Sequence, residues 1–408
     1  MQTNLAAFIK DTPEGQEADG ILRKCVHCGF CTATCPTYQL LGDELDSPRG
    51  RIYLIKQVLE GSEPTKKTQL HLDRCLTCRA CETTCPSGVR YGRLADIGRE
   101  LVDARVRRSL LAAVARRALR FVLPHRSRFT PLLRLGQAVR PLLPGPIRLK
   151  VPPKQRPRHW PVSRHRRRVL VLDGCVQPAI APDINAAAAV VLDRVGISLV
   201  SVPGQTCCGA VSHHLTAHEE GLDFMRRNVD AWWPHVEAGA EAIVSTASAC
   251  TAMIKEYVDL LAHDPRYAKK AARISQMTRD LSQLLAAEDR SAIRSRNEAR
   301  IAFHSPCTLQ HGQKLPRVVE GILTDAGFDL APVPDAHLCC GSAGTYSILQ
   351  PDLSKRLLRD KLAALESGDP QIIATANIGC LAHLQSGASL PVVHWIQLLA
   401  EADQNARG

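Results

Sequence analysis

The chain has 408 residues, of which 45% are hydrophobic and 23% are charged, so a disordered chain and a polytopic membrane protein are both excluded. Its 16 cysteines occur without a secretory signal and without an apolar stretch long enough to span a membrane, so we expect a cytoplasmic protein whose cysteines bind metal rather than form disulfides. The net charge of +12 comes from segment 101–168, which has nineteen Lys and Arg but one acidic residue, so binding to nucleic acid is not expected.

The first 100 residues contain the same run of cysteines twice, 50 positions apart. The two runs are Cys25, Cys28, Cys31, Cys35 and Cys75, Cys78, Cys81, Cys85, each followed by proline. This spacing is that of bacterial ferredoxins with two [4Fe–4S] clusters, in which the fourth cysteine of each run binds the cluster of the other run. We therefore predict one cluster on Cys25, Cys28, Cys31 and Cys85, and a second on Cys75, Cys78, Cys81 and Cys35. Zinc, which also uses Cys-x2-Cys pairs, is the weaker alternative.

The residues between the two runs predict helical rather than β structure. Ser47 and Pro48 have the types preferred at an N-cap and at the first helical position. Ile52, Ile55 and Leu59 then share one apolar face. We expect residues 1–100 to form a helical ferredoxin domain.

Residues 101–167 are expected to form a basic linker that is helical at first and then rich in proline. Segment 105–140 mixes arginine with leucine, valine and phenylalanine, a pattern that suits the surface of an anionic membrane. Docking on acidic partner subunits, or on the acidic parts of this chain, explains the pattern equally well.

The remainder of the chain contains a longer repeat. Cys175 recurs as Cys307 and Cys207-Cys208-Gly209 as Cys339-Cys340-Gly341, both shifted by 132, and Cys250 recurs as Cys380. Strands are predicted at 168–174, 197–203, 241–247, 300–306, 328–334 and 371–377, and helices at 181–196, 316–327 and 353–368. This alternation predicts two α/β modules with largely parallel sheets, residues 168–298 (the first repeat) and 299–408 (the second repeat). The predicted fold class is α+β multidomain.

Each repeat offers four cysteines near strand ends, where α/β sheets usually bind ligands. The sets are Cys175, Cys207, Cys208, Cys250 and Cys307, Cys339, Cys340, Cys380. They are candidates for an additional metal or cluster site, for redox-active thiols, or for buried structural cysteines. The sequence also lacks a nucleotide-binding glycine fingerprint, since GSAGTY has the wrong context.

Over essentially its full length the chain resembles the family of glycolate oxidase (glycolate dehydrogenase) iron–sulfur subunits. The resemblance is carried by CVHCGFCTATCPTYQLLGDELDSPRGRIYLIKQVLEG, DRCLTCRACETTCPSGVRYG, TLQHGQKL, HLCCGSAGTY and TANIGC. The Cys-Cys-Gly modules alone are less specific, because heterodisulfide reductase, a glycerol-3-phosphate dehydrogenase subunit and lactate-utilisation proteins also have them. Heterodisulfide-reductase modules have a fifth cysteine where this chain has Ala247 and Asn377.

The resemblance implies a non-catalytic electron-transfer subunit of an oxidoreductase. An FAD-bearing subunit, with a second flavoprotein-like subunit, would oxidise glycolate to glyoxylate. This chain would pass the electrons to a quinone-type acceptor from the inner face of the cytoplasmic membrane. Alternatives are the same role for D-lactate or glycerol-3-phosphate, and a heterodisulfide-reductase-like enzyme.

Overall fold

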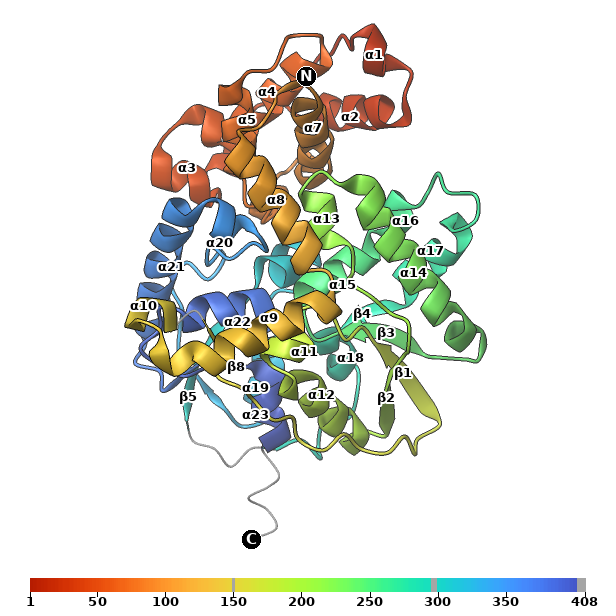
Figure 1. Cartoon of the computed structure of the whole chain (residues 1–408), viewed down its shortest axis with the longest axis vertical. Coiled ribbons are helices and arrows are strands. Elements are labelled where there is room, and N and C mark those ends of the chain that lie inside the picture. The colour runs from red at the N-terminus through yellow and green to blue at the C-terminus, as the bar shows by residue number, and fades with distance from the viewer. Residues whose placement is uncertain (149–150, 295–298, 402–408) are drawn as a thin grey trace.

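The computed structural model describes residues 1–148, 151–294 and 299–401 (Figure 1). Its N-terminal part is helical, and the rest consists of two α/β units, as the fold class predicted. The boundary predicted between the two repeats, at residue 298, and the C-terminal residues 402–408 of the second repeat lie outside the described residues. None of the helices in the described ranges is both long enough and apolar enough to cross a membrane.

The N-terminal domain contains short helices connected by the cysteine loops. They are α1 (Ala7–Lys10), α2 (Pro13–Lys24), η1 (Phe30–Thr32), α3 (Pro36–Leu41), η2 (Glu44–Asp46), α4 (Pro48–Leu59), α5 (Lys66–Asp73), α6 (Ala80–Thr84) and α7 (Tyr91–Arg105). The predicted start of α4 is confirmed, because the Ser47 hydroxyl accepts a hydrogen bond from the Gly50 amide and Pro48 follows it. The predicted apolar face is also confirmed, since Ile52, Ile55 and Leu59 are buried in the core of the domain.

The basic segment contains α8 (Leu110–Val122), α9 (Arg126–Val139), η3 (Arg140–Leu142) and α10 (Gly145–Arg148). Helices α8 and α9 cross the outside of the molecule from the N-terminal domain to the α/β units (Figure 1). Neither helix buries a residue fully.

Each repeat builds a parallel sheet, with four strands among the described residues. The first has the order β2-β1-β3-β4, from β1 (Arg167–Val171), β2 (Ile197–Ser201), β3 (Ala242–Ser245) and β4 (Thr278–Asp280). The second has the order β6-β5-β7-β8, from β5 (Arg300–His304), β6 (Asp329–Leu330), β7 (Ile372–Thr375) and β8 (Val392–His394). The matching order shows that the two repeats share one topology.

The helices of the repeats follow their strands. Those of the first repeat are α11 (Gln177–Ile180), α12 (Asp183–Arg194), α13 (Ala210–His214), α14 (His218–Glu237), α15 (Ser248–Lys255), α16 (Tyr257–Leu260), α17 (Ala268–Met277) and α18 (Leu281–Ala286). Those of the second repeat are η4 (Thr308–Gly312), α19 (Val318–Asp325), α20 (Tyr346–Leu349), α21 (Pro351–Glu366), α22 (Ile378–Gln385) and α23 (Trp395–Glu401). One continuous apolar core contains strand residues of both sheets, including Val169, Val171, Ile301 and Phe303, so the repeats pack as a single unit.

The strand predicted at 328–334 is wrong in length, because β6 contains only Asp329 and Leu330. Pro332 and Pro334 follow, and proline has no amide hydrogen to donate to a sheet. Strands β4 and β8 were not predicted, since each has only three residues and too little pattern to detect.

His394 connects the two repeats through a buried hydrogen bond. Its Nε2 lies 2.8 Å from the carbonyl oxygen of Thr246, and its Nδ1 lies 3.3 Å from the amide nitrogen of Ile396. Nε2 therefore donates to the carbonyl and Nδ1 accepts from the amide, an arrangement that requires the neutral imidazole. Burial lowers the pKa of His394 to about 4.

We expect this histidine to make the protein less stable in mild acid. The unfolded chain binds a proton at His394 below pH about 6.5 and the folded chain only below about 4, so stability falls as the pH drops through this window. The expected loss is about 1 kcal/mol between pH 7.5 and 5.5. Thermal unfolding at several pH values measures it. His394→Gln should reduce the pH dependence, whereas the exposed His263→Gln should not. An unchanged dependence in His394→Gln contradicts this account.

Candidate metal centres

Each ferredoxin motif is a loop that contains one short helical segment, η1 in the first motif and α6 in the second. Cys25 directly follows α2 and Cys35 is the N-cap of α3, while Cys85 directly follows α6. Backbone conformations with positive φ recur at the same two positions of both loops: His27 and Gly29 in the first (φ 55° and 85°), Thr77 and Arg79 in the second (φ 53° and 61°). Positive φ is uncommon for residues other than glycine. Its repetition is explained if both loops must wrap their thiols around a bound group.

Two cavities lie against these loops, and each is lined by cysteines of both runs. The first cavity is lined by Cys25, Cys28, Cys31, Cys81 and Cys85. The second is lined by Cys35, Cys75, Cys78 and Cys81. Cys85 therefore lies with the first run and Cys35 with the second, while Cys81 faces both cavities.

Three of the thiols that line these cavities have raised pKa values. Burial, together with the nearby Cys25 and Cys28, raises the pKa of Cys31 to about 11. Burial and neighbouring cysteines also raise the pKa values of Cys78 and Cys81 well above the usual range. Iron ions bind thiolates and offset this cost, so the donor set fits an iron–sulfur cluster in chemical type and in number.

Two buried arginines flank the second cavity. Arg51 is 1% exposed, and its Nε donates to the carbonyl oxygen of His71 at 2.7 Å. Arg99 donates to the carbonyl oxygen of Cys75 at 2.6 Å. Burial alone would raise the pKa of the Cys75 thiol, but these two guanidinium groups bring it below its ordinary value. The Cys75 thiol of the second cavity thus has two guanidinium groups close to it, one of which, that of Arg51, also pairs with the buried carboxylate of Asp46 at 3.2 Å.

The two cavities also differ in their access to solvent. Cys28 is exposed, and the side chains of Val26 and Phe30 beside it are 67% and 59% exposed. The second cavity is covered by the second repeat, where Leu76 packs in one apolar cluster with Cys307, Cys339 and Tyr346. The first cavity therefore lies near the surface and the second lies inside the molecule.

In each repeat the four cysteines lie together as a chain of contacting thiols. Cys175 contacts Cys207, Cys207 contacts Cys208, and Cys208 contacts Cys250. The second repeat has the same chain, formed by Cys307, Cys339, Cys340 and Cys380. Cys175 and Cys307 follow the first strands of their sheets, and Cys250 and Cys380 lie in the first turns of α15 and α22. Strand ends and helix starts thus bring together cysteines up to 75 residues apart in the sequence.

A cavity of about 220 Å³ connects the second ferredoxin loop with the second repeat. It is lined by Cys75 and Cys78 on one side and by Cys307, Cys339 and Cys380 on the other. None of the four cysteines of the first repeat lines it. Among the two cysteine sets of the repeats, that of the second repeat is therefore the one that shares a cavity with the second ferredoxin loop.

Some residues of these sites were not among the predicted ones. Arg51 and Arg99 look like ordinary helix-surface residues in the sequence, and only the packing of α4 and α7 buries them. His304 and Lys361 are buried beside the cysteines of the second repeat. A comparison of the two repeats could have found them, because the equivalent positions, 132 residues earlier, are Leu172 and Val229.

The regions that contain these cysteines match known protein families. Residues 21–89 match the family model of the 4Fe-4S dicluster domain, and residues 169–255 and 301–385 match that of the cysteine-rich domain. The chain is 56% identical to the glycolate oxidase iron-sulfur subunit of Escherichia coli (strain K12), covering 98% of this chain and 99% of that protein. It is 32% identical to the probable glycolate oxidase iron-sulfur subunit of Bacillus subtilis (strain 168), covering 94% of each. Lactate utilization protein A of Shouchella clausii is 26% identical over 55% of this chain and 95% of its own length.

Proposed function

The chain belongs to the family of glycolate oxidase iron–sulfur subunits, and we propose that it carries electrons from a flavin subunit that oxidises glycolate to a quinone-type acceptor. It is an iron–sulfur, non-catalytic subunit of an oxidoreductase complex. The observation that carries the proposal is the pair of cavities lined by cysteines of both ferredoxin loops.

We assign the ligands of the two clusters in the crossed arrangement. The first cluster takes Cys25, Cys28, Cys31 and Cys85, and the second takes Cys75, Cys78, Cys81 and Cys35. The grouping of cysteines around the two cavities supports this assignment. A bound [4Fe–4S] cluster accepts and releases one electron at a time.

The surroundings of the two clusters indicate the order in which electrons pass through them. The exposed loop at Cys28 suits the first cluster to receive electrons from a partner subunit, with Val26 and Phe30 as apolar contacts. The buried arginines suit the second cluster to hold an electron, because nearby positive charge favours the reduced form. Electrons would therefore enter at the first cluster and move to the second.

Glycolate, rather than lactate, is the substrate we propose for the complex. The similarity to the glycolate oxidase subunits covers nearly the whole chain, whereas that to lactate utilization protein A covers about half of it and is weaker. The catalytic partner would be an FAD subunit, accompanied by a second flavoprotein-like subunit.

Cys28→Ser is the direct test of the electron-transfer role. In the assembled complex we expect it to abolish electron transfer from glycolate to a quinone analogue, because the first cluster loses a ligand at its exposed side. The flavin content of the complex should stay unchanged. Spectroscopic flavin quantification and a quinone-reduction assay provide the two readouts.

Val26→Ala is the matched control, since Val26 lies in the same loop, is exposed and offers no ligand atom. It should retain most of the quinone reduction. Full quinone reduction by Cys28→Ser, or loss of bound flavin in that variant, would contradict an electron-transfer role for this cluster.

We further propose that the basic helices hold the chain on an anionic membrane surface. Arg108 and Arg116 pair with Asp73, at 2.6 and 2.9 Å, and so fasten the start of the segment to the N-terminal domain. Apolar side chains of helix α8 point to solvent, since Leu110 and Leu111 are 79% and 83% exposed. On α9 the same holds for Leu132 and Leu135 (53% and 63%). The arginines that dock on Asp73 and the leucines that would contact lipid thus lie on different sides of this segment.

The purified chain should bind vesicles of phosphatidylglycerol, and bind much less to vesicles of phosphatidylcholine, because arginines favour anionic lipid. Leu110→Ser with Leu111→Ser should weaken the binding at least about tenfold, since burying each leucine contributes about 2 kcal/mol. Vesicle co-sedimentation measures both effects. Leu45→Ser, at an exposed leucine of the N-terminal domain, is the control. Equal binding to both lipids would rule out this surface.

A further inference from the structure

The surroundings of the cysteines differ between the two repeats. In the first repeat, Leu172, Val229 and Met253 lie in one apolar cluster with Cys207 and Cys208. Counted along the sequence by the shifts of 132 and 130 that relate the cysteines, the corresponding positions of the second repeat are His304, Lys361 and His383. Three apolar side chains in one copy therefore correspond to three nitrogen-bearing side chains in the other. The first repeat also has a buried polar residue beside Val229, since Asn228 donates to the carbonyl oxygen of Cys207 at 2.8 Å. Both repeats have the same four cysteines, so these neighbouring side chains are what distinguishes the metal-binding chemistry of one repeat from that of the other.

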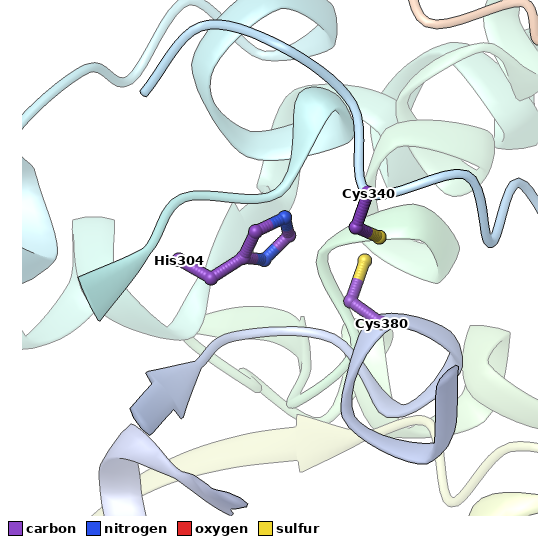
Figure 2. Close-up of side chains that lie close together, drawn as sticks. All are labelled: His304, Cys340 and Cys380. Carbon is purple, nitrogen blue, oxygen red and sulfur yellow. The ribbon is translucent and has the colours of Figure 1, made fainter. Parts of the chain in front are cut away.

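His304 is directed at the cysteines of the second repeat. It is the last residue of β5, is 2% exposed, and its ring faces the sulfurs of Cys340 and Cys380 (Figure 2). One ring nitrogen and the two sulfurs all lie within 4.8 Å of one another. Nδ1 lies 3.0 Å from the hydroxyl of Thr375, whereas Nε2 is buried and has no hydrogen-bond partner among the described residues. A buried unpaired ring nitrogen is costly unless it binds something.

The side chain of a buried lysine lies near the cysteines of the second repeat. Lys361 is 3% exposed, its Nζ donates to the carbonyl oxygen of Asp335 at 2.8 Å, and it interacts electrostatically with Cys307, Cys339 and Cys340. A group of thiolates carries excess negative charge, which a lysine at this position partly neutralises. The first repeat has Val229 there, with no charge to offer.

The donors and the space beside them favour a centre larger than one ion. His304 offers an imidazole nitrogen and the four cysteines offer thiols, five ligand atoms in all, whereas a single zinc ion takes four. Cys307, Cys339 and Cys380 line the 220 Å³ cavity, which provides space for a group larger than one ion, whereas Cys340 and His304 are not among its lining residues. On the other side of that cavity lie Cys75 and Cys78 of the second cluster.

We propose that the second repeat binds a third iron–sulfur centre through Cys307, Cys339, Cys340, Cys380 and His304, and that the first repeat binds none. His304 would use Nε2, the nitrogen left free by Thr375. The first repeat is then a structural copy, whose apolar residues fill the space beside its cysteines. This inference goes beyond the proposed function, because it concerns metal content and holds for any electron donor.

A matched pair of variants tests the proposal in the full chain purified without oxygen. Cys340→Ser and Cys208→Ser change equivalent residues of the two repeats. Iron, zinc and sulfide analysis together with EPR gives the metal content, and circular dichroism checks the fold. The wild type should contain more iron than the about eight atoms of two cubane clusters. Cys340→Ser should fall to about eight, while Cys208→Ser should keep the wild-type content.

Two variants of the histidine separate ligation from folding. His304→Leu, which copies the first repeat, should lose the additional iron, and His304→Cys should restore a soft ligand and with it much of the iron. A wild type with only about eight iron atoms would overturn the proposal, as would one zinc per chain that disappears in Cys340→Ser. Equal iron loss in Cys208→Ser would overturn the difference between the repeats. None of these outcomes depends on glycolate oxidation, so the proposal can fail while the proposed function stands.

Discussion

Cys28→Ser and Cys85→Ser are expected to remove the same cluster, although the two cysteines belong to different runs. In the crossed assignment both bind the first cluster, so each variant should lose about four iron atoms and the double variant should lose no more. The physical reason is that four thiolates hold one cubane, so the loss of any one of them destabilises the whole cluster. Iron analysis and EPR of the reduced protein measure the effect.

Cys28→Ser combined with Cys35→Ser is the matched control. These two residues lie in one run but, in the crossed assignment, bind different clusters, so this double variant should lose about eight iron atoms. If instead the Cys28 and Cys35 pair loses about four and the Cys28 and Cys85 pair about eight, each run binds its own cluster and the assignment is wrong.

Arg51→Met is expected to destabilise the N-terminal domain by about 3 kcal/mol or more, because it breaks a buried ion pair from one side. The guanidinium contacts the carboxylate of Asp46 at 3.2 Å and the hydroxyl of Thr37 at 3.0 Å, and the Asp46 side chain is fully buried. The carboxylate would keep only Arg74 and His71 as partners. Thermal unfolding of the intact chain should begin about 10 °C lower.

Arg49→Met is the control two residues earlier on the same helix. Arg49 forms an ion pair with Glu44 that is partly exposed, so its loss should cost less than about 1 kcal/mol. A second readout tests the electrostatic role of Arg51: removing its charge should lower the reduction potential of the second cluster. If the two variants unfold at the same temperature, the buried ion pair of Arg51 does not stabilise the domain as described.

Much of the fold was predictable because its signals are local. The spacing of Cys25 to Cys35, the Ser47–Pro48 helix start and the apolar runs of β1 and β5 each act within a few residues. The fold class and the iron–sulfur clusters followed from these patterns, whereas the family followed from the resemblance of longer motifs, and the comparisons agree. The short strands β4 and β8 escaped because three residues paired at a sheet edge have no periodicity to detect.

The sequence by itself determined which residue types could bind metal and how they repeat. The duplicated cysteine runs and the duplicated Cys-Cys-Gly motifs need no coordinates to be found. It could not determine which side chains from distant parts of the chain meet, because that depends on how helices and sheets pack. The tertiary structure buries Arg51 and Arg99 beside Cys75, and it brings Cys78 to the cysteines of the second repeat. It also directs His304 at Cys340 and Cys380, where the first repeat has Leu172 packed among apolar side chains. Two cysteine sets that look alike in the sequence therefore lie in different chemical surroundings.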